Sequence, residues 1–313
     1  MSLTRFQLLP TTTVMSAPLP VLINSAMASD HGTDLLARLR ASFAANGVEA
    51  RVSAVDRHDL IQAARVAAAD RPPLIVAGGG DGTLSAVASV LVGTDTALGV
   101  LPLGTFNHFA KDLGIPMGLD DAVRTVVARH RDRVDVGEVN GRIFLNNASL
   151  GIYPQMVAER QRRQRLQGRG KFLAAAMAMI ATLWRFPFLS VRVRIHGEQH
   201  LRHSAFVFIG NNEYRMDGHD VGGRRGMQGG ILSLVVSRDT GRWGMVVLAA
   251  RALLGTLREA DDLDVGSARE LSIETRHRRM RVATDGELVV VDTPLRFRIR
   301  AAALWVITPE SET

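Results

Sequence analysis

The chain has 313 residues, 46% of them hydrophobic and 22% charged, which is ordinary for a folded protein and leaves room for two domains. It contains no cysteine, which excludes disulfides and thiolate-based metal or catalytic sites and is consistent with a reducing compartment. The formal net charge of +7 favours an anionic partner, such as a nucleotide, a nucleic acid or an acidic lipid surface, without distinguishing among these.

The first third of the chain alternates strand-like and helix-like segments. Residues 1–20 lack the apolar core of a secretory signal, and we expect a loose leader there. The pattern predicts strands at residues 20–26, 48–55, 74–77 and 97–101, and helices from about 30 or 33 to 45 and at 59–69, 84–91 and 119–130. Such alternation predicts a doubly wound α/β domain over residues 18–132, with ligands at the carboxyl ends of its parallel strands.

A glycine-rich turn follows the third predicted strand. Residues 78–83 read Gly-Gly-Gly-Asp-Gly-Thr. Glycine lets the backbone approach a ligand closely, so that successive N–H groups and the next helix N-terminus can face a phosphate. Asp81 then stands where a carboxylate can hold a metal ion or accept a proton. Taken alone, the motif leaves an ordinary strand-to-helix turn open.

A second polar turn follows the next strand. Gly104, Thr105 and Asn107 place a glycine, a hydroxyl and an amide at the end of a neighbouring strand, facing the same crevice as the first turn. The alternative is that Gly104 and Asn107 only cap the following helix. Neither a Walker sequence nor a Gly-x-Gly-x-x-Gly sequence occurs, so the turns predict a phosphate site of another design.

Short strand-like runs dominate from residue 133 onward. They lie at residues 134–139, 142–147, 189–196, 200–210, 231–237, 270–275, 280–283 and 288–299, with helical stretches at 154–165, 171–185 and 243–258. This texture predicts a second, mainly β domain over residues 133–299, built as a sandwich or barrel-like sheet. The segment 300–313, with a strand-like run at 303–308, is expected to return to the first domain.

A third motif lies between two of the late strand-like runs. Residues 284–287 read Thr-Asp-Gly-Glu, which supplies two carboxylates, Asp285 and Glu287. An Asp-Gly pair between strands is also the common signal of a tight hairpin, so this motif alone leaves a surface turn open.

Together the three motifs resemble the diacylglycerol kinase catalytic family, which includes bacterial soluble lipid kinases and the sphingosine and ceramide kinases. The likeness covers residues 20–309. It implies an N-terminal domain like those of NAD kinases and phosphofructokinases, a C-terminal β-sandwich, and a cleft between them for ATP, Mg²⁺ and a lipid headgroup. The implied activity is transfer of the ATP γ-phosphate to the hydroxyl of diacylglycerol or a similar lipid, as in phospholipid biosynthesis.

The resemblance also implies roles for individual residues. Asp285 and Glu287 match the carboxylates of which one is the base toward the lipid hydroxyl, and the two remain unranked. Asp81 would hold Mg²⁺ through ATP or position polar groups. The expected nucleotide-binding residues are Asn24, Gly79, Gly80, Asp81, Gly82, Thr83, Leu84, Ser85, Gly104, Thr105 and Asn107.

The chain departs from the family pattern at two places. His108 stands where many relatives have Asp, and it can still donate a hydrogen bond to a phosphate or a headgroup. Gln228, near Arg224 and Arg225, stands where relatives with a structural magnesium site carry acidic residues, which argues against that site here. Asp217 and Asp220 are out of register with it.

A basic and apolar segment suggests how a lipid is reached. Residues 160–171 carry five arginines and a lysine beside an apolar helix at 172–184, which is too short to cross a bilayer. The pattern favours peripheral docking on an anionic membrane surface from the cytoplasm. Alternatively this helix packs in the core and the arginines face water, and residues 243–257 share the ambiguity.

Two other functions stay open. One is a soluble kinase of the NAD kinase type, and the other is a non-catalytic lipid-binding protein of the same fold, suggested by His108 and Gln228. Retention of Asp81, Asp285 and Glu287 argues against the second. No aromatic-interleaved or helix-turn-helix pattern supports nucleic-acid binding. A homodimer is left open.

Overall fold

The computed structural model describes residues 17–30, 34–151, 189–195, 198–204, 206–214, 224, 226–237 and 263–310. Several sequence-based expectations lie outside these residues. They are the leader before residue 17, the helices at 154–165, 171–185 and 243–258, the basic segment at 160–171, and the side chains of Asp217, Asp220 and Arg225.

The first part of the chain forms a parallel sheet in the strand order β2-β1-β3-β4. Its strands are β1 (Leu19–Asn24), β2 (Ala50–Val55), β3 (Leu74–Gly79) and β4 (Ala97–Pro102). Every residue of β3 and β4 is buried, which explains their continuous apolar sequences, because a parallel strand covered on both faces has no polar side.

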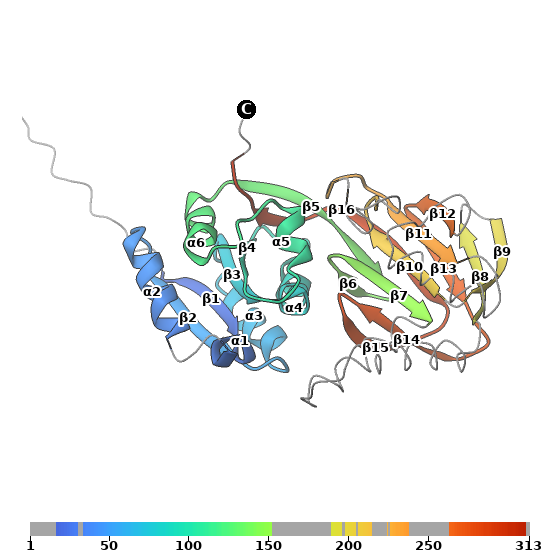
Figure 1. Cartoon of the computed structure of the whole chain (residues 1–313), viewed down its shortest axis with the longest axis horizontal. Helices are drawn as coiled ribbons and strands as arrows, with labels where there is room; N and C mark the ends of the chain where they lie inside the picture. The colour runs from blue at the N-terminus through green and yellow to red at the C-terminus, as the bar shows by residue number, and fades with distance from the viewer. Residues whose placement is uncertain are drawn as a thin grey trace, which may run out of the picture.

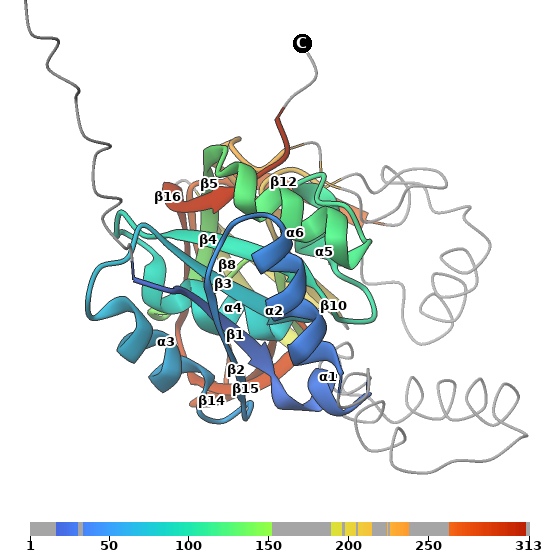
Figure 2. The same cartoon turned by 90° about the vertical axis from the view of Figure 1, so that its left-hand side faces the viewer.

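Helices cover both faces of this parallel sheet, as Figure 2 shows. In chain order they are α1 (Ser25–Asp30), α2 (Leu35–Ala45), α3 (Leu60–Ala68), α4 (Asp81–Leu91), α5 (His108–Asp112) and α6 (Leu119–Ala128). Helix α2 packs with α6, and α3 packs with α4. The predicted doubly wound α/β fold is confirmed. The short helix α1 was not expected, because its six residues are too few to show a helical period.

The strand register places three turns at one edge of the sheet. Ile23 pairs with Gly78, and Gly78 pairs with Leu101, so β1, β3 and β4 end at nearly the same level. The chain order reverses between β1 and β3, and such a reversal is where doubly wound sheets bind ligands. The two glycine-containing turns therefore lie at the expected binding edge.

The second part of the chain is a two-layered β structure (Figure 1). Among the described residues, one sheet of six strands has the order β12-β11-β10-β7-β14-β15. It packs against antiparallel strands that continue the parallel sheet, through a shared core that includes Phe144, Ile209 and Phe297. The predicted C-terminal β-sandwich is confirmed.

The strands of the second part differ in detail from the sequence-based expectation. They are β5 (Arg131–Val139), β6 (Arg142–Phe144), β7 (Asn147–Gly151), β8 (Leu189–Ile195), β9 (Glu198–Ser204), β10 (Phe206–Asn211), β11 (Leu232–Ser237), β12 (Leu263–Ala268), β13 (Glu270–Glu274), β14 (Arg279–Thr284), β15 (Glu287–Asp292) and β16 (Leu295–Ile307). Three predicted runs, at residues 142–147, 200–210 and 288–299, are each divided between two strands. The strand β12 was missed, since Asp264 and Gly266 interrupt its apolar pattern.

One long strand joins the two parts. β16 pairs antiparallel with β13 and β5, and further along Val306 pairs in parallel with Leu98 of β4. The residues 303–308, expected to return to the first domain, lie at this end of the chain. A register shift between Arg300 and Leu304 bends the strand from one role to the other. No helix within the described ranges is long and apolar enough to cross a membrane.

Candidate functional site

The turn after β3 is held by the end of β1. Gly80 is the extended residue before α4, and its carbonyl accepts the N–H of Thr83 at 2.9 Å. The Nδ2 of Asn24 donates to the Oγ1 of Thr83 at 3.0 Å, while the Oδ1 of Asn24 accepts the N–H of Ala26 at 3.0 Å. The structure therefore brings Asn24 and the first motif together, with Asn24 fixing the threonine hydroxyl.

The two glycine turns touch each other. A Cβ on Gly104 would lie 2.4 Å from the Cα of Gly80, so this approach is possible only for glycine. Asn107 shapes the second turn from within, since its Oδ1 accepts the N–H of Gly104 at 2.9 Å and its Nδ2 donates to the carbonyls of Pro102 and Gly104 at 3.2 and 2.8 Å. The Asn107 amide is thus used inside the loop, and Thr105 is the exposed hydroxyl.

Asp81 caps α5 from a distance. Its Oδ1 accepts the N–H of Phe109 at 3.0 Å, and its Oδ2 accepts the N–H of His108 at 3.3 Å. The alternative in which Gly104 and Asn107 only cap this helix is not supported, because the Asn107 side chain makes no cap hydrogen bond to α5. A carboxylate at the first N–H groups of a helix is favoured by their partial positive charge. Asp81 therefore links the first motif to α5.

The Thr-Asp-Gly-Glu motif is both a hairpin and part of the site. Asp285 and Gly286 have positive φ values of 48° and 78° and form the two-residue turn between β14 and β15. The Asp285 carboxylate accepts three backbone N–H groups from the β6–β7 turn, those of Leu145 at 2.7 Å, Asn146 at 2.8 Å and Asn147 at 3.2 Å. The carboxylate is therefore fixed in one orientation.

Burial sets the protonation of Asp285. It raises the pKa of the carboxyl from 3.8 to about 6, against the lowering effect of the N–H donors of Leu145 and Asn146. A hydrogen bond with the Ser85 side chain lowers this pKa, and the negative charge of Asp81 raises it. Asp81 belongs to the first motif, Ser85 follows that motif on α4, and Asp285 belongs to the third motif, so the first and third motifs meet in space.

Glu287 reaches the same turn from the other end of the hairpin. A Cβ on Gly82 would meet the Oε1 of Glu287 at 2.5 Å, so Glu287 lies directly over Gly82. Its carboxylate pairs with Arg57, 3.0 Å away, in the turn that follows β2. Sequence reasoning missed Arg57, for which the only signal is its position just after a strand of the same sheet. Both side chains remain accessible, at 35% for Glu287 and 53% for Arg57.

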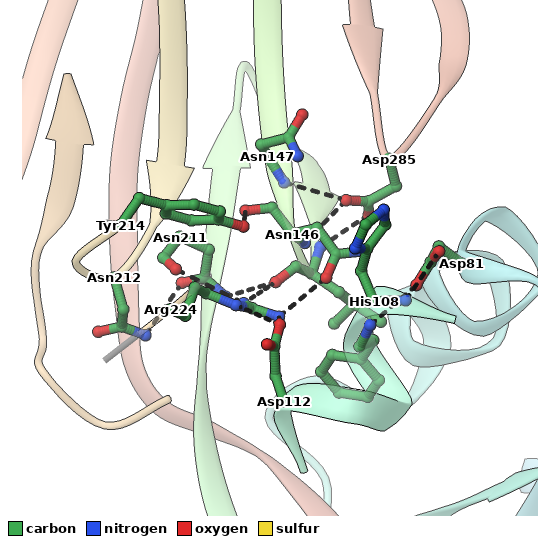
Figure 3. A network of polar contacts seen from close by, with 12 residues as sticks. Asp81, His108, Asp112, Asn146, Asn147, Asn211, Asn212, Tyr214, Arg224 and Asp285 are labelled. Atoms are coloured by element: carbon green, nitrogen blue, oxygen red, sulfur yellow. Dashed lines mark hydrogen bonds and ion pairs between the residues drawn. The ribbon is translucent and has the colours of Figure 1, made fainter. Parts of the chain in front are cut away.

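Arg224 is the centre of a buried polar network, shown in Figure 3. Its side chain is 1% exposed. The Nε donates to Asp112 of α5 at 2.7 Å, Nη1 to the carbonyl of Leu145 at 2.7 Å, and Nη2 to the Oδ1 of Asn146 at 2.8 Å. Sequence reasoning did not predict this network.

Two further side chains secure the β6–β7 turn. The Nδ2 of Asn211 donates to the carbonyl of Leu145 at 2.8 Å, and the hydroxyl of Tyr214 donates to the carbonyl of Asn146 at 2.9 Å. Burial raises the pKa of Tyr214, which keeps its hydroxyl protonated as a donor. The turn that holds Asp285 is therefore bonded on both sides.

The side-chain amide of Gln228 is bonded to β5. Its Nε2 donates to the Oδ1 of Asp132 at 2.8 Å and to the carbonyl of Arg133 at 2.9 Å. The nearby buried Asp135 accepts the N–H groups of Gly230 and Ala302, each at 2.7 Å. Within the described part of the chain no three His, Cys, Asp or Glu side chains are grouped to hold a metal.

Mg²⁺ bound with nucleotide phosphates has a different requirement. It takes one or two carboxylates and completes its octahedron with phosphate oxygens and water. Asp81, beside Asp285 and the glycine turns, fits that smaller donor set. His108 stacks on Phe106 with ring centroids 5.6 Å apart at the exposed rim of the same region.

Leu84 has no group to offer a ligand. Its side chain is fully buried in the core, and its N–H donates to the carbonyl of Gly80 at 3.1 Å. The expectation that Leu84 contacts a nucleotide is therefore corrected: it anchors α4 to the sheet. The structure places the other predicted residues, from Asn24 to Glu287, around the two glycine turns.

Two family models match this chain, one for each of its two parts. A family model described as diacylglycerol kinase catalytic domain matches residues 18–139, and one described as YegS C-terminal NAD kinase beta sandwich-like domain matches residues 148–308. A probable lipid kinase YegS-like from Pseudomonas fluorescens is 32% identical over 266 residues, 82% of this chain and 83% of the relative. A relative of the same description from Pseudomonas savastanoi pv. phaseolicola is 31% identical over 251 residues, 75% of each chain.

Solved structures give the same fold. A crystal structure of a diacylglycerol kinase from Bacillus anthracis superimposes with a TM-score of 0.64 at 19% identity, covering 95% of this chain and 98% of that one. Two further structures from that organism reach TM-scores of 0.68 and 0.70, each at 21% identity.

Proposed function

Because this chain belongs to the family of YegS-like lipid kinases, we propose that it transfers the γ-phosphate of ATP to the hydroxyl of diacylglycerol or a similar lipid alcohol. One observation carries the proposal: Asp285 and Glu287, on a hairpin of the β-sandwich, lie against Ser85 of α4 and Gly82 of the glycine turn. A carboxylate able to accept a proton thus stands beside a turn suited to phosphates, as phosphoryl transfer requires.

The glycine turns are the proposed phosphate side of the site. Backbone N–H groups of the turn between β3 and α4, at Gly80 to Gly82, and the exposed hydroxyl of Thr105 would face the phosphates, and Asn24 would keep Thr83 in place. Asp81 is the proposed carboxylate for Mg²⁺, which when bound neutralises phosphate charge. We assign residues 18–132 to this nucleotide half and residues 133–299 to the lipid half.

Asp285 is the proposed general base. It would take the proton of the lipid hydroxyl while that oxygen bonds to the γ-phosphorus and the bond from the γ-phosphorus to the leaving oxygen of ADP breaks. A pKa of about 6 leaves most Asp285 carboxylates ionised at neutral pH yet basic enough to accept a proton. Glu287 is the less suited of the two, because Arg57 already neutralises it.

The proposal is tested by lipid phosphorylation. The purified protein is incubated with labelled ATP, Mg²⁺ and micelles of diacylglycerol, monoacylglycerol or a sphingoid base, with Asp285→Asn as the low-activity control. We expect a phosphorylated, organic-extractable product from the wild type and far less of it from the variant. NAD in aqueous buffer is a further arm, and phosphorylated NAD without any lipid product would instead identify an NAD kinase-type activity. No product from any acceptor would refute the kinase assignment for these substrates.

A lipid acceptor lies in a membrane, so the protein must contact a membrane surface to reach it. We propose reversible contact with the anionic cytoplasmic face, supported by the formal net charge of +7. Co-sedimentation with phosphatidylglycerol vesicles should exceed that with phosphatidylcholine vesicles and should weaken at high salt. Equal binding to both vesicles would contradict the proposal.

A further inference from the structure

A continuous series of contacts connects Asp81, the carboxylate proposed for Mg²⁺, with Asp285, the proposed general base. Asp81 holds the first N–H groups of α5, and Asp112 ends that helix. Asp112 binds Arg224, whose guanidinium also binds the β6–β7 turn. That turn in turn donates its N–H groups to Asp285 (Figure 3). Among the contacts drawn in Figure 3, those of Arg224 alone join α5 directly to the β6–β7 turn.

We propose that Arg224 is a positioning residue for the reaction. It fixes the turn at Leu145 and Asn146 against Asp112, and thereby fixes the Asp285 carboxylate relative to Asp81 and the glycine turns. The inference rests on the proposed kinase function for its consequence in catalysis. Its structural half, that Arg224 holds the turn, stands independently of the substrate.

The chemistry of arginine suits this role. A guanidinium presents five N–H donors in one rigid plane, so a single side chain can bind a carboxylate and two carbonyl-type oxygens at once. Arg224 does this at 1% exposure, with three donors directed at Asp112, Leu145 and Asn146. Lysine carries its charge on one nitrogen and cannot reproduce the fork.

If the ion pair between Arg224 and Asp112 only stabilised the fold, its removal should have a different effect on the reaction. Replacing a buried ion pair by apolar residues of similar size is often neutral or stabilising, whereas removing one partner leaves an uncompensated charge. The double variant Asp112→Leu/Arg224→Met therefore removes the contacts of Arg224 without leaving either Asp112 or Arg224 as an unpaired charge. If Arg224 only stabilises the fold, this double variant should behave like the wild type.

The test compares that double variant and Arg224→Lys with the wild type. The control is Ile273→Val, a core change in the β-sandwich away from the turn, which lowers stability without touching Arg224. NMR amide exchange is measured for Leu145 and Asn146, with Val207 of β10 as the internal reference. Lipid-kinase kcat and the KM for ATP are measured on the same samples.

We expect exchange at Leu145 and Asn146 to rise at least about tenfold in both Arg224 variants and to stay unchanged in Ile273→Val. We also expect kcat to fall by about 10- to 100-fold, since misplacing a reacting group by about 1 Å can cost about a hundredfold, with the ATP KM within about twofold. Unchanged exchange at both amides, or a kcat within twofold of an active wild type, would overturn the proposal. An inactive wild type would refute the kinase function alone, because amide exchange still decides whether Arg224 holds the turn.

Discussion

Asp285 gives the site a specific dependence on pH. Its pKa of about 6 lies above the ordinary value of 3.8 because burial disfavours the charged form. A general base works only when ionised, so kcat/KM should rise with pH and level off above about pH 6 to 7. The measurement is a profile of kcat/KM from pH 4.5 to 8.5. A limb centred near pH 4, the value of a solvated aspartate, would contradict the assignment of Asp285.

The raised pKa of Asp285 makes stability depend on pH in the opposite direction to activity. A carboxyl whose pKa is raised in the folded state favours folding while it is protonated, so its contribution is present below about pH 3.8 and is lost as pH rises through about 6. Activity therefore increases over the pH range in which this contribution to stability declines. Burial of the ionised Asp285 carboxylate has an energetic cost, which the backbone N–H donors offset only in part, and this is a common arrangement for a reacting group.

The two carboxylates of the hairpin are expected to differ in importance. Asp285→Asn should lower kcat by about 10²- to 10⁴-fold, the usual contribution of a general base. Glu287→Gln should lower it by less than about tenfold, because an exposed ion pair such as that with Arg57 is worth at most about 1 kcal/mol. Steady-state kinetics of the two variants check the ranking, and a larger loss in Glu287→Gln would reverse it.

At the scale of elements, the contact between the two glycine turns is a strict requirement. Gly104→Ala would place a Cβ 2.4 Å from the Cα of Gly80, a backbone atom that cannot swing away. We expect the turns to separate, with the ATP KM raised by about tenfold or more and a lower Tm. Gly266→Ala is the matched control, since a Cβ there has its nearest neighbour at 4.0 Å. Equal effects of the two substitutions would show that the close approach has no importance.

The secondary structure was easier to predict than the contacts between elements. β3 and β4 were identified because burial on both faces makes their sequences continuously apolar. The glycine turns were identified because glycine marks a special backbone geometry. The cap that Asp81 gives to α5 was not foreseen, because it joins residues 27 and 28 positions apart. The Arg224 network was missed for the same reason, since its bond to Asp112 spans 112 positions and leaves no local period.

At the scale of the whole molecule, β16 continues the parallel sheet of the α/β part into one layer of the β-sandwich. Its first residues pair with β13 and β5, and Val306 pairs with Leu98 of β4. Leu304 and Val306 are fully buried in the core of the α/β part, while Phe297 of the same strand is buried in the core of the sandwich. Asp135 steadies the bend between these regions by accepting the N–H of Ala302 at 2.7 Å. A continuous strand therefore carries the relative position of the two parts.

A shared strand predicts that the two parts unfold together. Leu304→Ala removes a buried side chain at the α/β end of β16 and should cost about 2–5 kcal/mol. If the sheet couples the parts, calorimetry should show one transition, and the whole of it should move down by about 5 °C or more. Val290→Ala is the control, because that side chain is 65% exposed on β15 and its loss should change Tm little. Two separate transitions, with only one displaced by Leu304→Ala, would mean that the hairpin carrying Asp285 and the glycine turns are stabilised independently, and that the site depends on side-chain contacts such as those of Arg224 to stay assembled.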